Sequence, residues 1–186
     1  GPGRLERGQT IDSAGVPTSL LIAYWTDPDI ARRWWDCNEV ANYWQALPID
    51  KTTGFFFERM TVPHERFNYA AGTEDRHGSA AVLPIEASVT FGYWGAYRDR
   101  LPASKYDAFE SDLSTVPTPA AKDTTGRRLG VQIPNNLCYI REGQGWANCG
   151  VEERQIWDEQ MDGVIDSWVS RLARDPVATG CLSIRD

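Results

Sequence analysis

The stretch SLLIAYWTDP, residues 19–28, decides the fold class of this chain. Its apolar run has no polar interruption before Thr26, which is typical of a central β-strand. Asp27 is a favourable helix N-cap, and Pro28 suits the first helical position. A strand that leads directly into a helix indicates a fold that mixes both kinds of element.

The segments that follow extend this pattern. Apolar residues recur at helical spacing as far as Leu47, and Pro48 ends the predicted helix. The aromatic-rich segment 54–62 predicts a second strand. Residues 19–62 therefore read as strand, helix and strand, which is the opening of a ferredoxin-like unit.

The rest of the chain predicts a second set of elements around a long helix, 151–174, with an apolar stripe and a stop at Pro176. We expect an extended entry segment at 1–17, a partly helical connector at 63–71, a short strand at 88–92, a short helix at 103–113, a hairpin of 128–133 with 137–142 turned at 134–136, and a last strand at 179–184. The prediction is one two-layer α+β domain, residues 1–186, with helices 28–47 and 151–174 packed on an antiparallel sheet.

Composition limits the classes of partner. The net charge of −7 argues against nucleic acid and anionic membrane surfaces as partners. No run reaches transmembrane length, and no secretory signal opens the sequence. The 4 cysteines are scattered without a CxxC pair, so we expect reduced thiols, a cytoplasmic protein and no metal site built from them.

No strong catalytic signature stands out. The sequence has no phosphate-binding loop, nucleophile elbow or metal-spaced histidine pair. His77 lies in a polar loop and is interpreted as an exposed loop residue, and His64 has no partner nearby in the sequence. Composition and spacing alone predict an acidic α+β domain.

The segment GYWGAYRDRLP, residues 92–102, is the best candidate site. Arg98 and Arg100 are two positions apart, which places them on different sides of a helix. One guanidinium then points inward, where it needs an acceptor such as a polar substrate. The alternative is that Trp94 and Tyr97 are core residues and both arginines lie on the surface.

This segment resembles the haem-containing aldoxime dehydratases, in which GYWG runs into Arg-x-Arg-x-Pro. The resemblance covers nearly the whole chain in the same order: Ile11-Asp12, Leu20 to Trp25, Trp34 to Trp44, Gly54 to Pro63, Glu65-Arg66-Phe67, Asn136 to Trp146 and Gly180 to Ser183.

The resemblance implies a dimeric α+β barrel, built of ferredoxin-like halves, that encloses haem b and dehydrates an aldoxime, R-CH=N-OH, to a nitrile. It implies that the oxime nitrogen binds ferrous iron, that a distal histidine protonates the leaving hydroxyl, and that an arginine and a serine hold this hydroxyl. The chemistry is reasonable, because hydroxide is a poor leaving group unless it is protonated or hydrogen-bonded.

Carried over by motif, the catalytic arginine of the family falls on Arg100, so we expect Arg98→Ala to cost little activity. The serine of the family falls on Glu142, within Ile140-Arg141-Glu142-Gly143-Gln144. After Arg66-Phe67 the family has an acidic residue, whereas this chain has Asn68, which we expect to contact substrate. Three interpretations of these departures stay open. The negative charge lost at Asn68 and the one gained at Glu142 compensate each other, the chemistry is altered, or the activity is lost.

The proximal and distal histidines of the family lie C-terminal to its Gly-Cys-x-Ser strand. We therefore expect this chain to be a partial domain that contributes no haem ligand, with an aldoxime as its small-molecule substrate. The expected macromolecular partner is a second copy or the remaining part of its own chain. Two alternatives stay open: different N–O chemistry at the same haem, and a non-catalytic barrel that binds haem or another small ligand.

Overall fold

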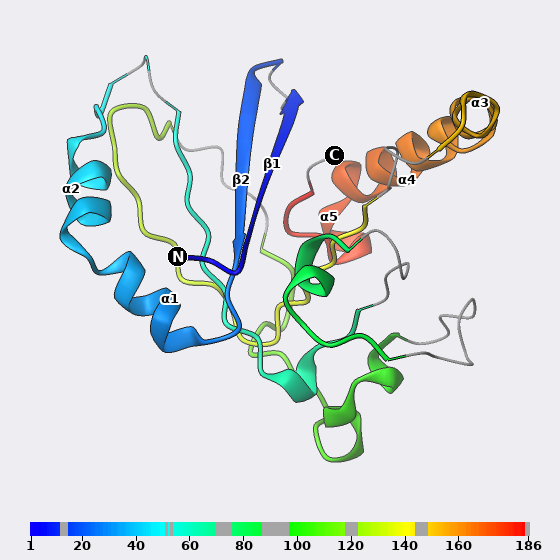
Figure 1. Cartoon of the computed structure of the whole chain (residues 1–186), viewed down its shortest axis with the longest axis horizontal. Coiled ribbons are helices and arrows are strands. Elements are labelled where there is room, and N and C mark those ends of the chain that lie inside the picture. The colour runs from blue at the N-terminus through cyan, green and yellow to red at the C-terminus, as the bar shows by residue number, and fades with distance from the viewer. Residues whose placement is uncertain are drawn as a thin grey trace. The chain divides into compact units, whose positions relative to one another are not determined.

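The computed structural model describes residues 1–11, 15–50, 52, 54–69, 76–86, 97–117, 123–143 and 149–184 (Figure 1). Within these ranges the chain combines helices with one two-stranded sheet, which confirms an α+β fold. No helix in this part of the chain is both long enough and apolar enough to span a bilayer.

The sheet pairs β1 (Arg4–Ile11) with β2 (Pro17–Tyr24). The strand predicted at 19–25 is thus confirmed as β2, whereas β1 occupies a segment that we expected to be an extended entry. Glu6 fastens β1 to a later turn, because its Oε1 accepts a hydrogen bond of 2.6 Å from the backbone N–H of Gly78.

Helix α1 (Pro28–Trp35) begins where the sequence predicts. The Asp27 carboxylate accepts hydrogen bonds from the backbone N–H groups of Asp29, at 2.8 Å, and Ile30, at 3.1 Å. These two bonds satisfy donors that a helix start otherwise leaves without partners.

The helix predicted over 28–47 is wrong in its length. The extended backbone of Cys37 separates α1 from α2 (Asn38–Ala46). This break allows Trp35 and Trp44 to contact the same Phe57 ring, with centroids at 3.6 Å and 5.9 Å.

The strand predicted at 54–62 is also wrong, because no strand is assigned there. Its aromatic rings pack instead on the two tryptophan-bearing helices: Phe55 meets Trp44 at 5.4 Å, and Phe57 meets Trp35. Packing of side chains, without a backbone ladder, therefore holds this segment.

Among the residues that the structure describes, four 3₁₀ turns follow: η1 (His64–Arg66), η2 (Gly78–Ala81), η3 (Tyr97–Arg100) and η4 (Pro102–Lys105). The turn η1 confirms the partly helical connector. The helix predicted at 103–113 is wrong, since only η4 forms and Phe109 adopts φ +52°, which no right-handed helix contains. The strand predicted at 88–92 falls outside the described residues.

The predicted helix 151–174 is interrupted. It consists of α3 (Val151–Gln160) and α4 (Asp162–Arg174), which meet at Met161. Pro176 does not simply end the helical region, because it opens α5 (Pro176–Thr179), capped by a hydrogen bond from the N–H of Ala178 to the Asp175 side chain at 3.1 Å.

The C-terminal strands predicted from the sequence are not assigned. The expected turn at 134–136 is present, and Asn136 takes a left-handed φ of +59° there. The flanking segments 128–133 and 137–142 carry no strand assignment, and neither do residues 179–184. The hairpin and the last strand are therefore wrong as predictions, although the turn is right.

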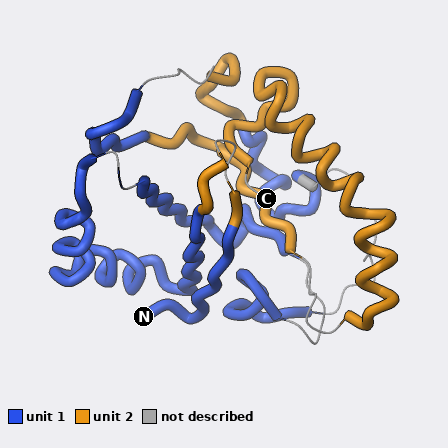
Figure 2. The backbone as a smooth tube through the Cα atoms, turned by 90° about the horizontal axis from the view of Figure 1, so that it is seen from above, with its two compact units in different colours: residues 1–9, 18–109, 123–131 blue, residues 10–17, 110–122, 132–186 orange. Residues whose placement is uncertain are grey.

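The chain divides into two compact units (Figure 2). Unit 1 holds residues 1–9, 18–109 and 123–131, and unit 2 holds residues 10–17, 110–122 and 132–186. Unit 1 contains α1, α2 and the four 3₁₀ turns, and unit 2 contains α3, α4 and α5.

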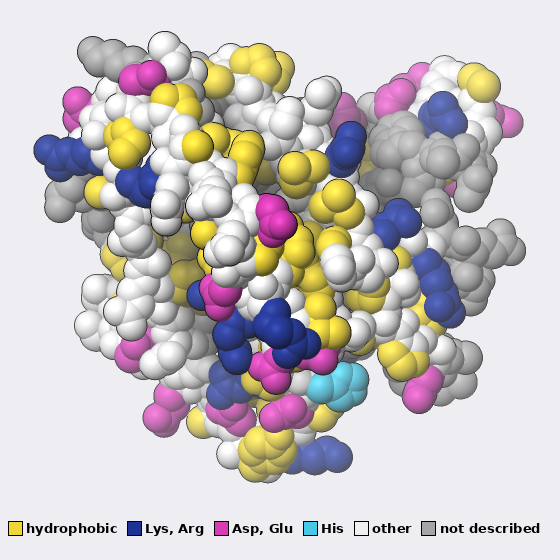
Figure 3. All heavy atoms as spheres, turned by 60° about the vertical axis from the view of Figure 1, so that its left-hand side comes forward, with side chains coloured by type: hydrophobic (Ala, Val, Ile, Leu, Met, Phe, Trp, Pro, Cys, Tyr) yellow, Lys and Arg dark blue, Asp and Glu magenta, His cyan; other side chains and the backbone are white. Residues whose placement is uncertain are grey.

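Many apolar side chains stay exposed in both units, and Figure 3 shows them in yellow among the charged groups. In unit 1, Phe55 is 56% exposed; in unit 2, Trp168 is 65% exposed. The most deeply buried apolar side chains that the structure describes are Ala80 and Ala103, at 3% and 0% exposed. The packing of unit 1 around η2 and η4 is thus its tightest part.

Candidate functional site

The turn η3 presents the two candidate arginines. It closes with a hydrogen bond of 3.1 Å from the N–H of Leu101 to the carbonyl of Arg98. Arg98 is exposed and Arg100 is half-buried. The structure thus gives the two side chains different surroundings, and the GYWG residues that precede them lie outside the described part of the chain.

The turn η4, which follows η3 directly in the chain, supports it. The two turns are in contact, and Ala103 at the centre of η4 is fully buried. The Ser104 hydroxyl donates to the carbonyl of Leu101 at 2.7 Å and lies 3.3 Å from that of Asp99. Side-chain hydrogen bonds therefore tie η4 to the backbone that carries Arg100.

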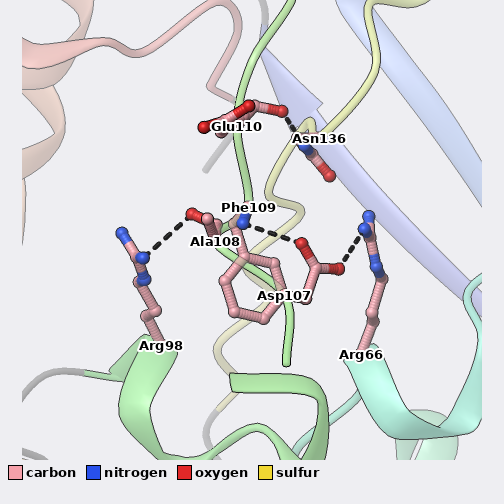
Figure 4. A network of polar contacts seen from close by, with 7 residues as sticks. All are labelled: Arg66, Arg98, Asp107, Ala108, Phe109, Glu110 and Asn136. Carbon is pink, nitrogen blue, oxygen red and sulfur yellow. Dashed lines mark hydrogen bonds and ion pairs between the residues drawn. The ribbon is translucent and has the colours of Figure 1, made fainter. Parts of the chain in front are cut away.

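An ionic cluster lies next to these turns (Figure 4). Arg66, at the end of η1, donates to the Asp107 carboxylate, and its guanidinium carbon lies 5.5 Å from the centre of the Phe109 ring. Arg98 lies at the same distance of 5.5 Å from this ring and donates to the carbonyl of Ala108 at 2.9 Å. The cluster thus brings Arg66 of η1 to Asp107, 41 positions later, and Arg98 of η3 to Ala108, 10 positions later.

Asp107 is the anion of this cluster, with a side chain that is 20% exposed. The backbone N–H of Phe109, at 2.8 Å, is the main cause that lowers the pKa of Asp107, and the hydrogen bond and charge of Arg66 and the charge of Arg98 add to it. Partial burial of the carboxyl raises its pKa, but the lowering by these hydrogen bonds and charges is larger. Asp107 is therefore held as a carboxylate.

Asn68 lies two residues beyond Arg66 and is half-buried. The rings on either side of it, Phe67 and Tyr69, lie 5.4 Å apart, and the Tyr69 hydroxyl donates to the carbonyl of Pro84. The amide of Asn68 is thus carried by an anchored segment of the same unit as Arg100.

Glu142 belongs to unit 2 and is exposed. In the same unit the side-chain amide of Asn136 donates to the carbonyl of Glu110, which fixes the turn that precedes the Glu142 segment (Figure 4). Arg100 is in unit 1, so the structure brings no other predicted site residue to Glu142 within unit 2, and its role stays a prediction.

Sequence reasoning missed Asp107 and Phe109 as partners of the arginines. Arg66 and Asp107 are separated by 41 positions, and no spacing rule joins residues at that distance. The available signal was an acidic residue between two aromatics, Tyr106 and Phe109, which is too common to identify a site.

The structure describes both histidines of the sequence, His64 and His77. His64 is exposed, whereas His77 is half-buried rather than exposed as expected from the sequence. Among the described residues, no group of three or more histidine, cysteine and acidic side chains is arranged to hold a metal ion. One pocket, of about 400 Å³, lies along α4 and is lined by polar residues of that helix such as Asp166, Ser170 and Arg174. A polar groove on a single helix does not suit an apolar porphyrin.

Comparison with known proteins assigns the family. Residues 1–186 match the family described as haem-containing dehydratase. The chain is 31% identical over 187 residues to phenylacetaldoxime dehydratase of Bacillus sp. (strain OxB-1), covering 98% of this chain and 53% of that relative. It is 29% identical over 191 residues to aliphatic aldoxime dehydratase of Rhodococcus erythropolis, covering 100% of this chain and 53% of that relative.

A third relative, aliphatic aldoxime dehydratase of Pseudomonas chlororaphis, is 29% identical over 180 residues, which is 94% of this chain and 50% of the relative. The chain thus spans about half the length of the curated relatives that it matches. Because the family match extends over every residue, the chain belongs to the haem-containing dehydratase family.

Proposed function

We propose that this protein is a haem-dependent aldoxime dehydratase, a carbon–nitrogen lyase that converts an aldoxime to a nitrile with loss of water. The observation that carries the proposal is the match over residues 1–186 to a haem-containing dehydratase family, with relatives named aldoxime dehydratases. An aldoxime is accordingly the proposed substrate.

Arg100 is the proposed catalytic cation. Its guanidinium donates to the oxygen of the oxime hydroxyl and stabilises the negative charge that develops as the N–O bond breaks. Its half-buried position on η3 supports this role, because a partly desolvated cation interacts more strongly with such charge than one in water.

Glu142 and Asn68 are the proposed polar partners of the substrate. A Glu142 carboxylate accepts a hydrogen bond from the oxime O–H, and in its protonated form donates one. The amide of Asn68 offers both a donor and an acceptor for orientation of the oxime. These assignments rest on motif positions, and the half-buried side chain of Asn68 is compatible with them.

Haem supplies an iron centre for the oxime nitrogen, while the protein supplies orientation and hydrogen bonds. We infer that neither His64 nor His77 would hold the haem, because neither stands at a ligand position of the family and His64 is exposed.

The dimeric barrel and the cytoplasmic location are also proposals. A two-stranded sheet such as β1–β2 is marginal alone in water, so further strands or a second copy are expected to pair with it. The four cysteines are thiols, which suits a reducing compartment.

A second candidate function is different N–O chemistry on the same haem. The observation that favours it is Glu142 at the position of the serine of the family, together with Asn68 in place of an acidic residue. In its protonated form, the Glu142 carboxyl can transfer its proton to the leaving oxygen, whereas a serine hydroxyl there only donates a hydrogen bond.

The test is to incubate the haem-loaded protein, reduced with dithionite, with an arylalkyl and an aliphatic aldoxime and to measure nitrile by gas chromatography. Free haem at the same concentration is the control. Enzyme-dependent nitrile supports the main proposal. Turnover of other N–O compounds alone would favour the second candidate, and a haem band without any turnover would favour a non-catalytic binding protein.

A further inference from the structure

Two guanidinium groups share one aromatic ring in unit 1. Arg66 and Arg98 each lie 5.5 Å from the centre of the Phe109 ring, and Figure 4 shows them on opposite sides of it. A cation above a ring is attracted to its π-electrons, and Arg is the cation that most often makes this contact. The ring therefore holds both side chains against the segment 107–109.

Asp107 makes this arrangement electrostatically acceptable. Two cations around one ring repel each other, and a carboxylate beside them offsets that repulsion. Asp107 accepts a hydrogen bond from Arg66 and also one of 2.8 Å from the N–H of Phe109, which fixes the ring between the arginines. Its oxygens thus set both the charge balance and the placement of the ring.

The cluster also holds the turn η3. A 3₁₀ turn of this length has poorer hydrogen-bond geometry than an α-helix, so its position depends on tertiary contacts. The Arg98 side chain provides one such contact through its 2.9 Å hydrogen bond to the carbonyl of Ala108. Arg100 lies two positions later on the same turn, so any displacement of Arg98 also displaces Arg100.

We propose that Asp107 is a positioning residue for Arg100: with Phe109, it holds Arg98 and thereby fixes the turn η3 that carries the catalytic guanidinium. This inference rests on the proposed function. It also changes the expectation from the sequence for Arg98, which becomes a second positioning residue rather than a dispensable surface cation.

The first experiment compares Asp107→Asn with Asp112→Asn, which makes the same change at an exposed carboxylate of unit 2. Amide hydrogen exchange is measured at Leu101, whose N–H closes η3. Asp107→Asn should speed this exchange about tenfold or more by releasing the turn, and Asp112→Asn should leave it unchanged. An unchanged rate at Leu101 in a folded Asp107→Asn protein would overturn the proposal.

The second experiment is a double-mutant cycle on nitrile formation by the haem-loaded enzyme. Asp107→Asn should lower kcat about tenfold, because a small displacement of a catalytic group has a large effect on rate. In an Arg100→Ala background the same change should add less than about threefold, since its effect passes through Arg100. Asp107→Glu, which keeps the charge, should recover part of kcat.

The two experiments separate two kinds of failure. If the wild-type protein forms no nitrile, the proposed function fails, and exchange at Leu101 still decides whether Asp107 holds the turn. If the wild-type protein is active but the effects of Asp107→Asn and Arg100→Ala simply multiply, the proposed function stands and the positioning role is refuted.

Discussion

The Trp35 indole stacks on the Phe57 ring, with centroids 3.6 Å apart and planes inclined by 9°. The contact joins the end of α1 to the segment 54–62, which follows α2 and forms neither helix nor strand. Trp44, on α2, meets the same Phe57 ring from its edge at 5.9 Å. One phenylalanine therefore holds the two helices in their relative orientation.

Removal of this ring should destabilise unit 1. We expect Phe57→Ala to lower the free energy of unfolding by about 1–3 kcal/mol, less than for a fully buried phenylalanine, because Phe57 is 43% exposed. Urea denaturation followed by tryptophan fluorescence measures the change. Tyr106→Ala, which removes a ring that is 73% exposed, is the control and should change stability by less than about 0.5 kcal/mol.

The cap of α1 should have a measurable effect of its own. Asp27→Ala removes the acceptor for two backbone N–H groups and should cost about 1 kcal/mol of unfolding free energy. Asp27→Asn keeps an acceptor oxygen and should cost clearly less. Equal losses in the two variants, measured from urea midpoints at constant slope, would contradict the capping role.

Asp107 should contribute to the acid sensitivity of the protein. Its pKa is lowered in the folded state, chiefly by the N–H of Phe109 and then by Arg66 and Arg98. A carboxylate whose pKa is lowered on folding stabilises the folded state fully at pH values above its pKa in the unfolded chain, which is about 3.9. This stabilisation is lost as the pH falls through the lower pKa of the folded state. The stability gap between wild type and Asp107→Asn should therefore be full at pH 6 and shrink below pH of about 4.

Asp123 provides the control for this pH dependence. The Thr125 side chain and then its backbone N–H lower the pKa of Asp123, through a hydrogen-bonded turn of three residues. Such a local turn partly persists in the unfolded chain, so its contribution to the difference between states is smaller. A larger pH-dependent gap for Asp123→Asn than for Asp107→Asn would contradict the tertiary origin of the effect.

Arg100→Ala should lower kcat for nitrile formation by about a hundredfold or more, which corresponds to the roughly 2–4 kcal/mol typical of a lost donor to developing negative charge. Steady-state kinetics with haem content held equal measures the effect. Full activity in Arg100→Ala would remove this residue from the proposed site.

Glu142→Ser introduces the serine that the family has at this position. Faster nitrile formation in this variant would mean that Glu142 is adapted to another substrate or reaction. Glu142→Gln keeps the shape without the charge, so the comparison of the two variants separates size from ionisation. If both leave kcat and KM unchanged, Glu142 is not part of the site.

The two histidines should not ligate the iron. We expect His64→Ala and His77→Ala to keep the Soret band and the axial-ligand spectrum of the haem-loaded protein, because neither matches a ligand position of the family and His64 is exposed. Loss of the axial bond in either variant, seen by resonance Raman spectroscopy, would place a ligand within this chain after all.

The sequence alone determined the local features of this protein. The start of α1 at Pro28, the turn near Asn136 and the strand β2 were all predictable, because a cap, a turn and an apolar run depend on residues within a few positions of one another. The family was also recognisable, because short motifs that resemble it occur in the same order along the sequence.

Only the tertiary structure decided what the aromatic and charged residues contact. The run at 54–62 has the composition of a strand, yet its rings pack on Trp35 and Trp44 without a backbone ladder. Asp107 joins Arg66 across 41 positions, and such a pairing depends on how the intervening chain folds rather than on either residue's neighbours. Strand pairing and ion pairing join residues that are far apart in the sequence, so patterns of a few residues do not specify them.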